Sequence, residues 1–280
     1  TFIISIMPKI RLIPVILLKN GRVVQSKRFK RHQILGTPSV IVSRLSNWFA
    51  DELVFLDISR DGNYCLNRDD LNFNNNNSIV DIIEEVSNNS FMPLTVGGGV
   101  RTVADVETRL AAGADKVVIN TQAIQEPDFI NKCAKIFGSQ CIVVSIDAKV
   151  KDDSWEVYKN YGRDPTGVSP VDFARKMQDY GAGEILINSI DNDGVGNGYD
   201  TKLVSSVVKS VSIPVIALGG AGKPEHFSTC INESRPNAVA AANIFQYTEN
   251  SYFNINSFLY NNSFNVRQPN LETIFEAGDS

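Results

Sequence analysis

Short apolar runs alternate with helix-like segments along most of this chain. The runs are continuous rather than alternating with polar residues, which is typical of parallel strands buried on both faces. Helical stretches such as 101–112 and 170–181 separate them. The pattern predicts an α/β fold, a (β/α)8 barrel, with a doubly wound open sheet as the main alternative. The eight runs are RLIPVILL (11–18), ELVFLDI (52–58), PLTVG (93–97), DKVVIN (115–120), CIVVSID (141–147), EILINS (184–189), IPVIAL (213–218) and NAVAAA (237–242).

The two halves of the chain are similar in sequence. Three matches in the same order indicate a half-barrel of four strands that is present twice, which an open sheet would not produce. The twofold repeat therefore favours the closed barrel. The matches are ELVFLDISRDG (52–62) with EILINSIDNDG (184–194), TVGGGVRT (95–102) with ALGGAGKP (217–224), and KVVINT (116–121) with AVAAAN (238–243).

Composition narrows the class of protein. A chain of 280 residues is long enough for one barrel of this kind, which needs about 250 residues. Its 43% hydrophobic and 21% charged residues fit a globular protein, and its net charge of −4 argues against a nucleic-acid partner. The one basic run is short and predicts a solvated loop; it consists of Lys27, Arg28, Lys30, Arg31 and His32.

The cysteines, the histidines and the two ends of the chain bear on metal sites, disulfides, location and domain bounds. The 4 cysteines and 2 histidines are scattered, so we expect no metal, no cofactor, no disulfide framework and a cytoplasmic location. The apolar TFIISIM (1–7) is too short for a membrane span, and we expect no membrane association. We expect an N-terminal extension at 1–10, the barrel at 11–250, and a C-terminal helix and tail at 251–280. The Asn run LNFNNNNS (71–78) predicts a surface loop.

Glycines and small polar residues stand where the predicted strands end, which is where barrels of this kind carry their active sites. Glycine lets backbone N–H groups approach an anion closely, and the next helix adds its dipole. Tight turns alone would also require glycines. Their pairing with polar strand ends in both halves favours two phosphate sites, and hence a ligand with two phosphate-like ends. These residues are Gly97, Gly98, Gly99, Asn120 and Thr121 in the first half, and Gly219, Gly220 and Asn243 in the second.

Carboxylates also follow the predicted strands. Asp147 ends the fifth strand, where a general acid or base would face the mouth, and Asp57 ends the second. Asp191 and Asp193 follow the sixth strand, and for these two the capping of the next helix is a strong alternative. The repeat sets Leu17 against Asp147. A symmetric acid–base pair across the mouth would therefore lack one carboxylate.

Taken together, these motifs resemble the cyclase subunit of imidazole glycerol phosphate synthase from residue 11 to residue 243. The resemblance implies a (β/α)8 barrel that receives ammonia from a glutaminase subunit and closes an imidazole ring on a bis-phosphate ribulosyl substrate. It implies that Asp147 is one of two catalytic aspartates and that Gly97–Gly99, Asn120 and Thr121 hold one phosphate. It assigns the other phosphate to Asp193, Gly194, Gly220 and Asn243, the last in place of the usual serine. The blocks that carry it are DELVFLDI, TVGGGVRT, GADKVVINT, VVSIDAK, SIDNDG and GGAGKPEHF.

Departures from this family pattern gather in the mouth. Leu17 takes the place of the other catalytic aspartate, and Gln25 that of a loop lysine. Asn188 and Leu218 replace a threonine and a serine. A leucine neither donates nor accepts a proton, and the loss of an acid–base group costs about 10²–10⁴ in rate. Ring closure by the family's mechanism is therefore not expected.

Charged residues stand at the starts of four predicted strands and so face the N-terminal floor of the barrel. A salt-bridged plug would explain them in any such barrel. The resemblance implies instead a gate through which ammonia enters, with the glutaminase docked on this N-terminal face. The gate residues are Arg11, Glu52, Lys116 and Glu184, and the residues facing the glutaminase are Asp115 and Gln140.

Three hypotheses follow. In the first, the chain belongs to a paralogous branch of the family that works with a glutaminase and an ATP-dependent amidotransferase on acetamidino sugars of surface polysaccharides. The barrel then passes ammonia onward. In the second, it is a working cyclase of histidine biosynthesis that makes imidazole glycerol phosphate and AICAR, with another group in place of Leu17. In the third, it is a scaffold for a glutaminase and catalyses nothing.

Overall fold

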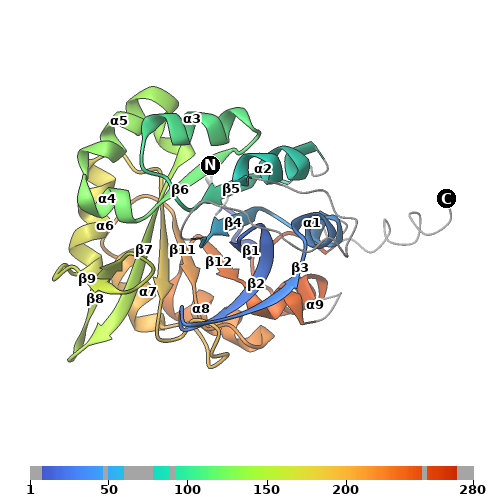
Figure 1. Ribbon diagram of the computed structural model, residues 1–280. Helices are drawn as coiled ribbons and strands as arrows, with labels where there is room; N and C mark the ends of the chain where they lie inside the picture. The colour runs from blue at the N-terminus through green and yellow to red at the C-terminus, as the bar shows by residue number, and fades with distance from the viewer. Residues whose placement is uncertain (1–7, 47–49, 60–77, 89–91, 248–250, 270–280) are drawn as a thin grey trace, which may run out of the picture.

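The computed structural model describes residues 8–46, 50–59, 78–88, 92–247 and 251–269. Eight parallel strands pair in the order β1–β4–β5–β6–β7–β10–β11–β12, and β12 pairs with β1 to close the sheet. Figure 1 shows the helices outside these strands. The predicted (β/α)8 barrel is confirmed and the open sheet is wrong, whereas the twofold repeat stays a prediction. The strands are β1 Arg11–Lys19, β4 Leu53–Asp57, β5 Leu94–Gly97, β6 Lys116–Ile119, β7 Ile142–Lys151, β10 Glu184–Ser189, β11 Val215–Leu218 and β12 Ala238–Ala241.

Helices connect successive strands, and several begin at a side chain that caps them. Thr102 caps α3 in a capping box with Asp105, Ser169 caps α6, and Asp200 caps α7. The predicted helical stretches 101–112 and 170–181 are therefore confirmed: α3 spans residues 103–111, and α6 begins at residue 170 and ends at residue 179. The helices are α1 Pro38–Ser46, α2 Ile79–Asn88, α3 Val103–Ala111, α4 Thr121–Gln125, α5 Asp128–Phe137, α6 Pro170–Asp179, α7 Thr201–Val208, α8 Pro224–Ser234 and α9 Ser251–Asn261.

Two apolar cores result from the alternation of side chains along the strands. In β1, Leu12, Ile16 and Leu18 pack outward against the helices. Ile13 and Leu17 of the same strand belong to a second cluster, which fills the inside of the barrel. Because β1 runs from the floor to the mouth, Leu17 lies inside the barrel near the mouth.

Two antiparallel hairpins extend the barrel at the mouth, and the sequence analysis did not predict them. The first is β2 Arg22–Lys27 with β3 Arg31–Gly36, and the second adds β8 Ser154–Lys159 and β9 Asp164–Pro165 to β7. The prediction of a solvated loop for the basic run is wrong for the backbone, because these residues form the tip of the first hairpin. Its lysine and arginine side chains are exposed, as predicted.

Helix α9 lies within the stretch 251–280, where a C-terminal helix and tail were expected, and its side chains complete the outer core. The Tyr252 hydroxyl donates to the backbone oxygen of Leu12 at 3.3 Å, and its ring contacts Phe245 with centroids 5.7 Å apart. The divisions proposed at residues 10 and 250 stay predictions. Residues 1–7 and nearly all of the Asn run, 71–77, lie outside the described residues. Among the described helices, none combines the length and the apolar character that a membrane crossing requires.

Candidate functional site

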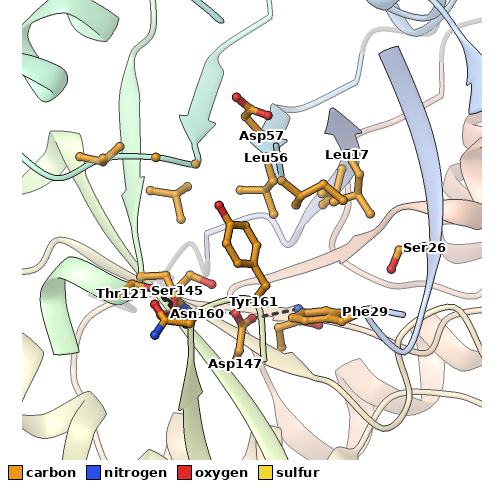
Figure 2. A pocket seen from close by; sticks show the side chains of 18 of the residues that line it. Leu17, Ser26, Phe29, Leu56, Asp57, Thr121, Ser145, Asp147, Asn160 and Tyr161 are labelled. Carbon is orange, nitrogen blue, oxygen red and sulfur yellow. Dashed lines mark hydrogen bonds between the residues drawn. The ribbon is translucent and has the colours of Figure 1, made fainter. Parts of the chain in front are cut away.

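A cavity of about 430 Å³ opens at the C-terminal ends of the strands. Its walls come from the ends of β1, β4, β6, β7 and β10, from the turn after β5, and from the tips of both hairpins. Figure 2 shows Leu17, Leu56 and Asp57 on one side of this space and Asp147, Thr121 and Ser145 on another. Parallel strands bring their carboxyl ends to one edge, which is why residues so distant in sequence meet here.

Asp147 is the carboxylate that the surroundings perturb most clearly. Its two oxygens accept hydrogen bonds of 3.1 Å from the side-chain amides of Asn188 and Asn120. Burial raises the pKa of Asp147 to about 7, the amide of Asn188 opposes this rise, and the charge of Asp193 adds to it. A group with a pKa near neutrality can take up and release a proton under physiological conditions. Asp147 is therefore suited to acid–base chemistry.

This raised pKa predicts how stability varies with pH. Asp147 releases its proton near pH 3.8 when unfolded but near pH 7 when folded, so between these values the folded state holds more protons. The contribution of Asp147 to stability therefore falls as the pH rises from about 4 to 7 and is constant above that. When the pH is raised from 5 to 8, the free energy of unfolding of Asp147→Asn should increase relative to that of the wild type by on the order of 2 kcal/mol.

The measurement is the free energy of unfolding from urea titrations of both proteins at the two pH values. Asp128→Asn serves as the matched control, because this carboxylate lies on an exposed helix surface 62% open to solvent. A difference between Asp147→Asn and wild type that stays constant with pH would contradict the raised pKa.

Leu17 lies across the barrel from Asp147. In the closed order of strands, β1 and β7 are separated by three strands on either side and so are diametrically opposite. Leu17 lines the cavity, and its exposed fraction is 9%. Leu56 and Leu218 also line the cavity and add apolar surface. An apolar wall thus faces Asp147 where a second acid–base group was expected.

Two further carboxylates line the cavity, and each already accepts hydrogen bonds from the protein. Asp57 accepts the backbone N–H of Ser59 at 2.9 Å. Asp193 accepts the hydroxyl of Ser26 at 2.8 Å and the backbone N–H of Phe29 at 3.3 Å, and burial raises its pKa. Asp193 is thus bound to the first hairpin.

Neither aspartate after β10 caps the following helix. Asp191 accepts the backbone N–H of Val150 at 2.8 Å and so joins the end of β7, while Asp200 caps α7. Helix capping, the alternative considered for Asp191 and Asp193, is therefore wrong. The strand-to-helix connection is longer than a single turn, so the capping residue comes several positions later.

Most of the residues predicted for the first phosphate meet in the cavity. Gly98, Gly99, Asn120 and Thr121 line it, and the side chains of Arg101 and Arg163 add positive charge. A Cβ on Gly98 would stand 2.1 Å from the backbone oxygen of Asp57, at a φ of +104°, so no other residue fits this turn. Gly97 does not line the cavity; its Cβ position faces the Val118 side chain at 2.7 Å.

The residues predicted for the second phosphate are placed differently. Apart from Asp193, none of them is among the described residues that line the cavity. A Cβ on Gly220 would meet the backbone oxygen of Gly198 at 2.1 Å, and one on Gly219 would meet Asn188 Oδ1 at 2.8 Å. Close backbone packing therefore accounts for these two glycines. Gly194 and Asn243 both contact the first hairpin.

The four predicted floor residues form one closed ring of ion pairs. Arg11 contacts both Glu52 and Glu184. Lys116 Nζ lies 3.1 Å from Glu52 and 3.0 Å from Glu184, and the hydroxyl of Thr95 donates to Glu52 at 2.6 Å. The glutamates are 2% and 7% exposed, whereas the cations retain 26% and 22%. Two acids and two bases thus close the barrel below its apolar interior.

The two residues predicted to face a glutaminase lie near this ring. Asp115 directly precedes Lys116 at the start of β6; it is exposed and accepts the backbone N–H of Leu94 at 2.7 Å. Gln140 is exposed just before β7. Both therefore lie at the floor end of the barrel with side chains open to solvent.

Several residues at the cavity were missed because they lie on the hairpin tips. Phe29 and Ser26 come from the first hairpin, and Tyr161 and Arg163 from the second. Tyr161 reaches across the mouth and donates its hydroxyl to the backbone oxygen of Ser59 at 2.9 Å. The Asn20–Gly21 pair forms the turn between β1 and β2. It is a strong hairpin signal and could have revealed that β2 folds back on β1.

Comparison with known proteins places this chain in a family. A family model described as "Histidine biosynthesis protein" matches residues 11–251. A protein of Dehalococcoides mccartyi strain BAV1 is 42% identical over 260 residues, covering 93% of this chain and 98% of the relative. A protein of Hydrogenobaculum sp. strain Y04AAS1 is 42% identical over 258 residues, covering 92% of this chain and 98% of that relative. Both relatives carry the name imidazole glycerol phosphate synthase subunit HisF. At this identity and coverage, the chain belongs to the HisF family of imidazole glycerol phosphate synthase subunits.

Proposed function

We propose that this protein is a barrel subunit that takes ammonia from a glutaminase at its floor and delivers it at its mouth without closing an imidazole ring. The observation that carries the proposal is Leu17 in the cavity, diametrically opposite Asp147. Ring closure needs protons to be taken and given at different atoms of the substrate, and an alkyl side chain does neither. The remaining carboxylate, Asp147, supplies only one of the two roles.

The route of ammonia follows from the two ends of the barrel. Above the ring of Arg11, Glu52, Lys116 and Glu184, the interior is lined by aliphatic side chains such as Ile13 and Leu186. An ammonium ion would lose its hydration in such an interior at a high free-energy cost, whereas neutral ammonia would lose far less. The charged floor and the apolar interior therefore suit the passage of neutral ammonia.

The partners follow from the same geometry. The glutaminase docks on the N-terminal face, where Asp115 and Gln140 are exposed. At the mouth, an ATP-dependent amidotransferase uses the ammonia to form an amidine on a nucleotide sugar or glycan. A phosphorylated small molecule binds at Gly98, Gly99 and Thr121 beside two arginines.

Lys116→Ala tests the passage of ammonia through the floor. With glutaminase and amidotransferase supplied, the variant should lose about tenfold or more of the glutamine-dependent amidation, because the ring that shapes the entrance is broken. Amidation driven by added ammonium salt should be unchanged, since that ammonia reaches the acceptor from solution.

Lys116→Arg keeps the charge at this position and is the matched control. Melting temperatures of both variants establish that the barrel remains folded. Unchanged glutamine-dependent amidation in Lys116→Ala would refute the passage and would favour a barrel that only holds the glutaminase in place.

A second candidate function is ring closure in histidine biosynthesis. It is favoured by relatives that are 42% identical and carry the synthase name, and by Asp57, which lines the cavity on the same side as Leu17 (Figure 2). In this case Asp57 would take the role that Leu17 lacks. Turnover of the bis-phosphate ribulosyl substrate by the wild-type chain separates the two candidates.

A further inference from the structure

Arg109 is a buried arginine of α3 whose side chain reaches back to the turn after β5. It is 7% exposed. Its Nη1 donates to the backbone oxygen of Asp105 on the same helix, and its Nη2 donates to the backbone oxygen of Gly98, both at 2.8 Å. A guanidinium carries several N–H donors in one rigid plane, so it can bond two carbonyl oxygens at once. Arg109 therefore joins α3 to the turn that follows β5.

This turn contains two successive glycines at positive φ. Gly98 has a φ of +104° and Gly99 a φ of +64°. Because neither residue has a Cβ, the peptide unit between them can rotate with little steric resistance from its own residues. The orientation of this peptide unit therefore depends on contacts from outside the turn. The hydrogen bond from Arg109 to the Gly98 oxygen is such a contact.

The orientation of this peptide unit decides which backbone group the cavity meets. In a trans peptide the C=O and the following N–H point in opposite directions, and none of the described peptide bonds is cis. Since the Gly98 oxygen faces Arg109, the Gly99 N–H points away from Arg109. Gly98 and Gly99 both line the cavity. If the peptide unit were rotated by half a turn, a carbonyl oxygen would replace this N–H and would repel an anion.

The charge of Arg109 acts in the same direction as its hydrogen bond. The position of a Cβ on Gly99 lies 3.8 Å from Arg109 Nη2, so the guanidinium stands close behind the turn. Solvent and salt screen a buried charge less than an exposed one. Arg101 and Arg163 line the cavity itself. An anion at this turn would thus meet an N–H group with positive charge behind and beside it.

We infer that Arg109 holds the Gly98–Gly99 peptide in the orientation that presents the Gly99 N–H to a phosphate group of the ligand. This inference rests on the proposed function, which places a phosphorylated molecule at this turn, and it adds the residue that makes the turn selective for an anion. Arg109 is a positioning residue, because it contacts the turn and is not among the described residues that line the cavity.

The first test measures the affinity for ribose 5-phosphate by isothermal titration calorimetry. Arg109→Met replaces the guanidinium by an unbranched side chain that fills much of the same space without a charge or an N–H donor. It should bind the probe about tenfold or more weakly than the wild-type chain. Arg109→Lys retains the charge and a donor for the Gly98 oxygen, and it should stay within about threefold of the wild type.

Arg175→Met is the matched control for the loss of an arginine. Arg175 is exposed on α6, and its replacement should leave the affinity for ribose 5-phosphate unchanged. Melting curves followed by circular dichroism establish that each variant is folded at the temperature of the titrations.

The second test observes the Gly99 N–H directly, which separates the orientation of the peptide from a general loosening of the fold. In protein labelled with 15N-glycine, ribose 5-phosphate should move the Gly99 amide proton signal of the wild type downfield, as acceptance by a phosphate oxygen does. Arg109→Met should lose this shift even at saturating probe. The signal is identified by its absence in Gly99→Ala, because a Cβ at this position has its nearest listed neighbour at 3.8 Å and fits.

The outcomes separate the inference from the proposed function. Unchanged affinity in Arg109→Met would overturn the inference, as would weaker binding with the Gly99 shift retained. An Arg109→Lys variant as weak as Arg109→Met would also contradict it. In each of these cases the wild-type chain still binds the probe, so the phosphate site stands. A wild-type chain that does not bind ribose 5-phosphate would overturn the phosphate site and the inference together. The titrations use no ammonia, so its passage is judged separately by Lys116→Ala.

Discussion

Leu17→Asp should raise the closure of the imidazole ring by about 10²-fold or more over the wild-type chain. The new carboxylate would stand on β1, opposite Asp147 on β7, and would restore two acid–base groups on facing walls of the cavity. The measurement is the rate of imidazole glycerol phosphate formation with ammonium salt as the nitrogen source.

The control is Leu17→Asn, whose side chain has nearly the shape of the aspartate but no titratable proton. It should give no gain. The rate of the aspartate variant should also change with pH near the pKa of Asp147, which burial raises to about 7. Equal rates in the asparagine and aspartate variants would show that Leu17 is not the missing acid–base position.

Glu52→Ala should lower the free energy of unfolding by about 3–5 kcal/mol, the range for breaking a buried ion pair by removing one partner. Glu52 is 2% exposed and contacts Arg11, Lys116 and the hydroxyl of Thr95. Without it, two cations share Glu184 alone, and the Thr95 hydroxyl loses its acceptor. Urea unfolding at pH 7 measures the change.

An exposed ion pair of the same chain serves as the comparison. Lys132 contacts Glu126 at 2.8 Å with both side chains about half exposed, and Lys132→Ala should leave the free energy of unfolding nearly unchanged. If Glu52→Ala were as mild as Lys132→Ala, the floor ring would be a solvated surface cluster. It would then provide no rigid entrance to the interior.

The strands, and the meeting of several polar strand-end residues in the mouth, were predictable because the relevant signals are local. Strands buried on both faces give continuous apolar runs, and the eight runs coincide with the barrel strands to within a few residues. Residues at the ends of such strands must meet at one edge, which is why Asn120 and Asp147 were placed correctly in the mouth. For these residues, the order of strands and helices along the chain determines where the side chains lie in the barrel.

The hairpins and their contacts were not predictable in the same way. In β2 and β3 the pattern of apolar residues is short, and the basic tip dominates it, so the segment has the composition of a loop. The contact between Asn243 and Ser26 depends on how the hairpin folds back over the mouth, which no local pattern encodes. The sequence therefore predicted the polar residue at the end of β12 but not that its side chain is occupied by the protein itself.

Turnover of the bis-phosphate ribulosyl substrate by the wild-type chain, with ammonium salt replacing the glutaminase, tests the central claim most directly. A relative named imidazole glycerol phosphate synthase subunit HisF, such as that of Hydrogenobaculum sp., is the reference under the same conditions. With Leu17 facing Asp147, ring closure should be slower than in the reference by about 10²–10⁴-fold. Turnover within about tenfold of the reference would contradict the claim and would identify this protein as a working cyclase.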